Sequence, residues 1–115
     1  KSLGREAAAE IEKHSQGLSC LYDMVFTSYK KNFQVAHMAV CGNTICGFTE
    51  DEAFSENEFQ KHIDGILKMD GHSNVSVKVF KNLPKYTERL DQMAQLESNE
   101  STTNALLATF KSVAL

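Results

Sequence analysis

The amino-acid sequence predicts an α+β fold in which a small antiparallel sheet is covered by helices. Residues 55–70 combine a helix start signal with the apolar spacing of an amphipathic helix. Residues 75–80 alternate apolar and polar side chains, which is typical of a half-buried strand. A Gly-Asn pair at 42–43 joins two apolar runs in the manner of a β-hairpin. We expect residues 1–115 to form a single domain.

The first predicted element is one long helix over residues 5–31. Its seam residues recur at alternating steps of four and three, a heptad-like spacing. Gly17 interrupts the pattern, so a break at this position is the alternative. Two lysines at 30–31 would place positive charge on the last turn, which suits the helix dipole. The seam residues are Ala7, Ile11, His14, Leu18, Leu21, Val25 and Ser28.

Residues 33–48 are predicted to form the hairpin, with Gly42 and Asn43 as its two-residue loop. A helix over residues 33–40 is the competing interpretation, because several side chains there are also compatible with a helix. The hairpin register pairs Cys41 with Thr44, Val40 with Ile45 and Ala39 with Cys46.

The connector over residues 49–58 is acidic and contains no basic residue. Carboxylates near a helix N-terminus complement its positive end, which accounts for much of this charge. A metal or a basic partner at the connector is the alternative interpretation.

The helix over residues 55–70 has well-defined ends in the sequence. Ser55 can cap its N-terminus, and Glu58 completes a capping box three residues later. Phe54 and Phe59 stand at the two positions of a hydrophobic staple. Gly71 is available for a left-handed residue that ends the helix.

Two more helices follow the strand at 75–80. Asn82 or Leu83 can cap the first of them, and Pro84 suits its first turn. The last helix is predicted over residues 103–115. We therefore expect the hairpin and the strand at 75–80 to form the sheet, with helices over one face.

An all-α fold with a degenerate EF-hand-like unit is the alternative. Asp70, His72, Asn74 and Ser76 alternate as calcium-loop ligands do, which resembles an EF-hand in part. The twelfth position of that loop is Lys81, where an EF-hand has a bidentate Glu.

Composition and charge narrow the class of protein. The net charge is −3 and the basic residues are scattered, so we expect no nucleic-acid partner. No apolar run reaches the roughly 20 residues of a membrane-spanning helix, so we expect no membrane partner either. The chain begins with Lys1, a start that a cleaved leader, a cut polyprotein or an excised domain would explain equally.

The cysteines are Cys20, Cys41 and Cys46, an odd number without the spacing of a disulfide framework. In the predicted hairpin Cys41 and Cys46 lie diagonally on one face, a poor geometry for a bridge. Reduced thiols in an intracellular protein are the expectation. One bridge and a free thiol in a secreted protein, or in a processed fragment, is the alternative, and the compartment stays undetermined.

His37, Cys41 and Cys46 are the group most suggestive of chemistry. Imidazole and thiolate bind zinc, but a zinc site needs three or four ligands at workable spacing. A Cys–His nucleophile pair needs a lowered thiol pKa, and the neighbouring acidic connector offers the opposite environment. We predict no metal, no cofactor and no catalytic residue.

The leading functional hypothesis is a non-enzymatic protein-interaction or oligomerisation module that binds another protein or a second copy of itself. Its interface would be the N-terminal seam, with Ile11, His14, Leu18, Leu21 and Val25. One alternative is a domain that binds a small molecule or cofactor, and another is a thiol-dependent enzyme using Cys41 or Cys46. The ligand pocket would lie between sheet and helices and be lined by Met38, Phe48, Phe59 and Tyr86.

Overall fold

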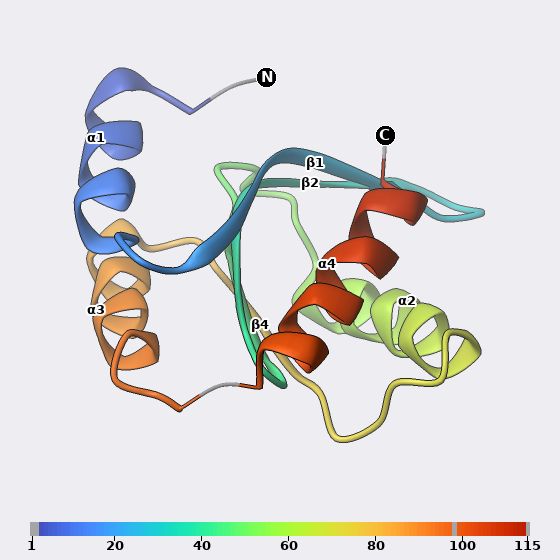
Figure 1. Ribbon diagram of the computed structural model, residues 1–115. Coiled ribbons are helices and arrows are strands. Elements are labelled where there is room, and N and C mark those ends of the chain that lie inside the picture. The colour runs from blue at the N-terminus through green and yellow to red at the C-terminus, as the bar shows by residue number, and fades with distance from the viewer. Residues whose placement is uncertain (1–2, 98, 115) are drawn as a thin grey trace.

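The computed structural model describes residues 3–97 and 99–114 and shows an α+β fold (Figure 1). Within these residues, four helices pack on both faces of a four-stranded sheet. The all-α alternative is not supported. The elements are α1 (Arg5–His14), β1 (Ser19–Thr27), β2 (Asn32–Cys41), β3 (Thr44–Phe48), α2 (Glu56–Met69), β4 (Ser76–Phe80), α3 (Leu83–Met93) and α4 (Glu100–Val113).

The sheet is mixed, with strand order β1-β2-β3-β4. The β2–β3 hairpin is confirmed together with its predicted register, and the competing helix over residues 33–40 is wrong. The expectation of a wholly antiparallel sheet is wrong at β4, which pairs parallel to β3. The reason is that α2 crosses over between β3 and β4, and a crossover brings the chain back in its original direction.

The long helix predicted over residues 5–31 is wrong. Helix α1 ends at His14, and β1 begins at Ser19 after a turn in which Gly17 has a φ of 82°. A left-handed residue is incompatible with a continuous helix, and glycine adopts it without steric penalty. Beyond the turn, the apolar residues that fit a heptad also fit a strand, and pairing with β2 along its length decides between them.

Helices lie on both faces of the sheet, whereas we expected them to cover one (Figure 1). Helices α2 and α4 cover one face, and α1 and α3 cover the other. Each pair encloses its own apolar cluster. The α2/α4 cluster is centred on Phe26, Phe33, Val35, Met38, Val40, Ile45, Phe59, Ile63, Leu106 and Phe110. The α1/α3 cluster is formed by Ile11, Ala39, Cys41, Cys46, Phe48, Tyr86, Leu90 and Met93.

The predicted ends of α2 are confirmed. Ser55 Oγ accepts a hydrogen bond from the Glu58 amide at 3.3 Å, and the rings of Phe54 and Phe59 lie 5.1 Å apart. The carboxylate of Glu58 bonds Lys31 at 2.6 Å and so takes no part in a reciprocal capping box. Gly71 has a φ of 79°, as expected for a left-handed helix end.

The segment after α2 closes that helix and leads into β4. The His72 amide donates to the carbonyl of Leu67 at 2.8 Å, and the Gly71 amide donates to that of Lys68 at 3.2 Å. These are the two bonds of a Schellman motif, which satisfies the last carbonyls of the helix. The segment is therefore a helix cap, and the EF-hand-like alternative is wrong.

The last two helices have asparagine caps. Asn82 Oδ1 accepts from the Lys85 amide at 3.0 Å, and Asn99 Oδ1 accepts from the Thr102 amide at 3.1 Å. Helix α4 begins at Glu100, three residues before the predicted start, because Asn99 supplies the cap. The predicted end of α4 at residue 115 lies outside the described residues.

Candidate functional site

On one side of β2 the sheet is open, because β3 stops at Phe48 while β2 extends further, to Asn32. Phe48, the last residue of β3, lies opposite His37. Over residues 32–35, β2 pairs with β1 on one side, and up to His37 no strand among the described residues pairs with its other side. The chain after Phe48 turns away instead and leads to α2. This stretch of β2 therefore behaves as a sheet edge.

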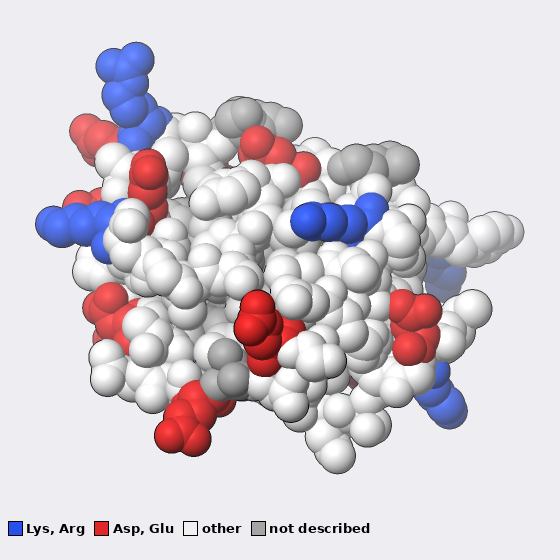
Figure 2. Space-filling view, viewed as in Figure 1, with Lys and Arg blue, Asp and Glu red and all other residues white. Residues whose placement is uncertain are grey.

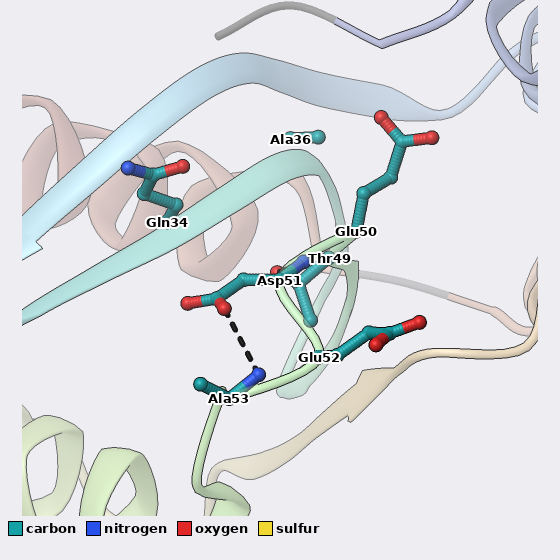
Figure 3. Close-up of a pocket in the computed structure, with 7 residues that line it drawn as sticks. All are labelled: Gln34, Ala36, Thr49, Glu50, Asp51, Glu52 and Ala53. Carbon is teal, nitrogen blue, oxygen red and sulfur yellow. Dashed lines mark hydrogen bonds between the residues drawn. The ribbon is translucent and has the colours of Figure 1, made fainter.

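A cavity of about 550 Å³ occupies this opening, and we call it the acidic hollow (Figure 3). Two of its lining residues come from β2, and the others come from the connector between β3 and α2. The lining residues are Gln34, Ala36, Thr49, Glu50, Asp51, Glu52 and Ala53.

Hydrogen bonds fix the connector wall of the hollow. The Asp51 amide donates to Thr49 Oγ1 at 3.1 Å, and the Ala53 amide donates to Asp51 Oδ1 at 3.0 Å. Phe54 is buried immediately beyond and packs on Phe33, with 5.7 Å between ring centroids. In Figure 3 the Asp51 carboxylate folds back toward Ala53. A preformed wall of this kind needs little ordering when a ligand binds.

The hollow is negatively charged and open to solvent. Glu50 and Glu52 are exposed, and both side chains extend away from the connector (Figure 3). Lys81 lies beside the connector and donates from Nζ to the main-chain carbonyl of Glu52 at 3.1 Å. Three carboxylates against one ammonium group leave a negative field. The hollow is therefore suited to a cationic ligand.

A second cavity, of about 450 Å³, lies between the β1–β2 turn and the first half of α2, and we call it the basic hollow. Lys31 Nζ bonds Glu58 at 2.6 Å, and this bond lowers the pKa of the Glu58 carboxyl. The His62 ring stacks on Phe33 with centroids 5.8 Å apart. The lining residues are Ser28, Tyr29, Lys30, Lys31, Phe33, Glu58, Lys61 and His62.

One face of the molecule carries dispersed charge. On the face shown in Figure 2, positive and negative side chains are scattered over the surface. None forms an extended field of one sign on that face.

The interface residues predicted from the heptad pattern do not form one surface. Ile11 is 1% exposed and packs in the α1/α3 cluster, whereas Leu21 packs in the α2/α4 cluster on the other face. His14 Nδ1 lies 2.7 Å from Asp91 Oδ1 on α3. Leu18 and Val25 are half-buried. Ile11 and Leu21 are therefore covered by the domain's own helices and sheet.

The four predicted pocket residues do not line one cavity. Phe48 and Tyr86 stack at 5.5 Å in the α1/α3 cluster. Met38 and Phe59 lie in the α2/α4 cluster on the opposite face. All four side chains are at most 4% exposed, so they are packed core residues.

A buried polar network lies on the α1/α3 side of the sheet. His37 is fully buried, its Nδ1 lies 2.7 Å from Tyr86 Oη, and that hydroxyl donates to the Cys46 carbonyl at 3.4 Å. Nε2 of His37 has no hydrogen-bond partner among the described residues. Burial lowers the pKa of His37 to about 4 and raises that of Tyr86. Both side chains are therefore neutral at physiological pH.

The thiols near this network are protonated at neutral pH. Burial raises the pKa of Cys20 to about 11, against a smaller opposing effect of a hydrogen bond to Ser15. Burial also raises the pKa of Cys46, although Arg89 opposes this. A thiol with a raised pKa is a poor nucleophile and a poor metal ligand. No group of three or more His, Cys, Asp or Glu side chains within residues 3–97 and 99–114 is arranged to hold a metal ion.

Comparison of the chain with protein-family models, with characterised proteins and with solved structures gives no match. Among the described helices, none has both the length and the apolar character needed to cross a membrane.

Proposed function

We propose that this chain is a non-enzymatic protein-interaction module whose acidic hollow binds an extended, basic segment of a partner protein. The observation that carries the proposal is the unpaired side of β2 at residues 32–36, next to Glu50 and Glu52. An exposed strand edge accepts another strand through main-chain hydrogen bonds, and nearby pockets select its side chains.

Charge supplies the preference for a basic segment. The exposed carboxylates of Glu50 and Glu52 attract lysine or arginine side chains on a strand that lies along β2. Because these carboxylates are exposed, the attraction weakens as salt is added. Affinity therefore depends on main-chain pairing, and selectivity depends on the carboxylates.

The protonation states of the buried groups favour a binding role over catalysis. His37 lies inside the core, and the raised thiol pKa values of Cys20 and Cys46 oppose thiolate chemistry. The carboxylates of Glu50 and Glu52, by contrast, face solvent, where a ligand can reach them.

A direct test uses a peptide of about ten residues that alternates lysine with threonine, long enough to form one strand. We expect the native protein to bind it, and to bind a matched peptide with glutamate in place of lysine at least about tenfold more weakly. Isothermal titration calorimetry at two salt concentrations measures both. Equal binding of the two peptides would contradict the proposal.

Two variants and two modified peptides locate the site. The double variant Glu50→Gln, Glu52→Gln should weaken binding, whereas the control Glu88→Gln, Glu97→Gln removes the same charge outside the hollow and should not. Each modified peptide carries N-methyl groups on every second amide, one on all lysines and the other on all threonines. One of the two should not bind, because an added strand pairs through alternate residues. If both modified peptides bind as well as the unmodified one, strand addition is excluded.

A further inference from the structure

We infer that the partner of the acidic hollow is a second copy of this chain, and that two copies pair through residues 30–36 around a two-fold axis. This inference rests on the proposed function, because it uses the same hollow. It adds the identity of the occupant, which is the stretch that runs from the β1–β2 turn into β2.

The turn at residues 28–31 is preformed for contact. Main-chain pairing of β1 with β2 extends to Thr27 and Asn32 at the base of the turn. The Ser28 amide donates to the Lys31 carbonyl at 2.8 Å, and the Lys31 amide donates to Ser28 Oγ at 3.2 Å. Tyr29 is fully exposed at the tip. A rigid turn that presents an aromatic ring to solvent is typical of a binding element.

The turn also has the charge that the acidic hollow requires. Lys30 and Lys61 are exposed and line the basic hollow. Lys31 is held by Glu58, so that carboxylate is already paired. No ion pair involves Lys30 or Lys61 among the described residues. The surface therefore presents two ammonium groups for a partner's carboxylates.

The two hollows follow one another along β2, which makes the surface self-complementary. The basic hollow includes Lys31 and Phe33, and the acidic hollow includes Gln34 and Ala36. Lys31 and Gln34 are three residue steps apart, which is about 10 Å along an extended chain. When two such strands run antiparallel, the basic end of each lies beside the acidic end of the other. Such a two-fold arrangement is the commonest symmetry of protein dimers.

The open side of β2 provides the main-chain groups for this pairing. An antiparallel alignment centred on Phe33 sets Gln34 of one copy opposite Asn32 of the other, so that opposed side chains share a face of the sheet. It also sets Lys30 of one copy opposite Ala36 of the other. Lys30 then lies near Glu50 and Glu52 of that other copy. The two sheets become continuous, and both unpaired edges are covered at once.

Charge reversal tests the inference on the intact chain. We expect native protein to dimerise in sedimentation equilibrium, and either Lys30→Glu, Lys61→Glu or Glu50→Lys, Glu52→Lys to weaken dimerisation at least about tenfold. An equimolar mixture of the two variants should dimerise to within about threefold of native protein, because each charge reversal then meets its opposite. The control Lys13→Glu, Lys111→Glu changes charge outside both hollows and should leave dimerisation unchanged.

The outcomes separate this inference from the proposed function. A native protein that stays monomeric at several hundred micromolar, or variants that do not recover on mixing, would overturn the dimer. The Lys30→Glu, Lys61→Glu variant keeps its acidic hollow, so its binding of the lysine-threonine peptide tests that hollow alone. Peptide binding with a monomeric native protein leaves the proposed function standing and rejects the dimer. If the protein neither dimerises nor binds the peptide, both the dimer and the proposed function are rejected.

Discussion

The two faces of the sheet are packed with different kinds of side chains. On the α2/α4 face, aromatic rings meet edge to face, with centroids 5.6 Å apart for Phe26 and Phe59 and 5.3 Å for Phe33 and Phe59. On the α1/α3 face, a buried histidine and a buried tyrosine bond one another. The first face is stabilised by apolar burial and packing, which are insensitive to pH. The second face depends on hydrogen bonds and on one titratable group staying neutral.

Strand β2 contributes to both faces because its alternation shifts. Phe33, Val35 and Met38 all belong to the α2/α4 cluster. Strict alternation along the strand would put Met38 on the face opposite to Phe33 and Val35. Asp23 of β1 has a φ of 51° beside this point, a left-handed conformation that breaks the regular pleat. The shift leaves His37 enclosed and Ala36 at the rim of the acidic hollow.

The largest effect is expected on the aromatic face. Phe59→Ala should lower the free energy of unfolding by roughly 3–5 kcal/mol, because it empties the centre of a ring cluster and removes the staple to Phe54. Chemical denaturation at several pH values measures this loss. The loss should be the same at pH 7 and pH 5, and a loss below about 1 kcal/mol would mean that this face is not the main core.

A pH-dependent effect of intermediate size is expected on the polar face. The folded pKa of His37 is about 4 against an ordinary value of 6.5, so the unfolded chain binds a proton more readily. This contribution to stability is present above pH 6.5 and falls away as the pH drops from 6.5 to about 4. Its full size is roughly 3 kcal/mol.

The variant His37→Phe isolates this contribution. It removes the titrating group while keeping a ring in the site, so stability should change less between pH 6.5 and 4 than in native protein. Urea denaturation at half-unit pH steps gives both curves. If the two curves run parallel, His37 is not the group that makes this face sensitive to acid.

A smaller effect is expected from the partner of His37. Tyr86→Phe keeps the ring stacked on Phe48 but removes the hydroxyl that bonds His37 Nδ1. Nε2 already has no partner among the described residues, so neither ring nitrogen of His37 then has one. An unsatisfied buried polar group of this kind costs about 1–3 kcal/mol. In the His37→Phe background the same change should cost less, and a double-mutant cycle measures the difference. Additive losses would show that the two side chains are not coupled.

Local signals predicted the elements whose ends are encoded by neighbouring residues. The cap at Ser55, the left-handed end at Gly71 and the loop at Gly42 each depend on contacts within a few residues, and all three are as predicted. The cap at Asn82 belongs to the same group. Chain neighbours supply these interactions, so the sequence alone determines them.

The tertiary structure decided the rest. Residues 19–27 satisfy both a helical and an extended pattern, and only β2, a distant segment, selects the strand. The sequence did not predict the turn at 28–31, because these residues were assigned to the helix over residues 5–31. The one local signal for the turn is that two runs of strand-forming residues flank it. Whether β4 ran parallel, and which face each helix covered, depended on the α2 crossover. The acidic connector was visible in the sequence, but the hollow beside it exists because β3 stops at Phe48 while β2 continues, a difference that arises only when strands pair.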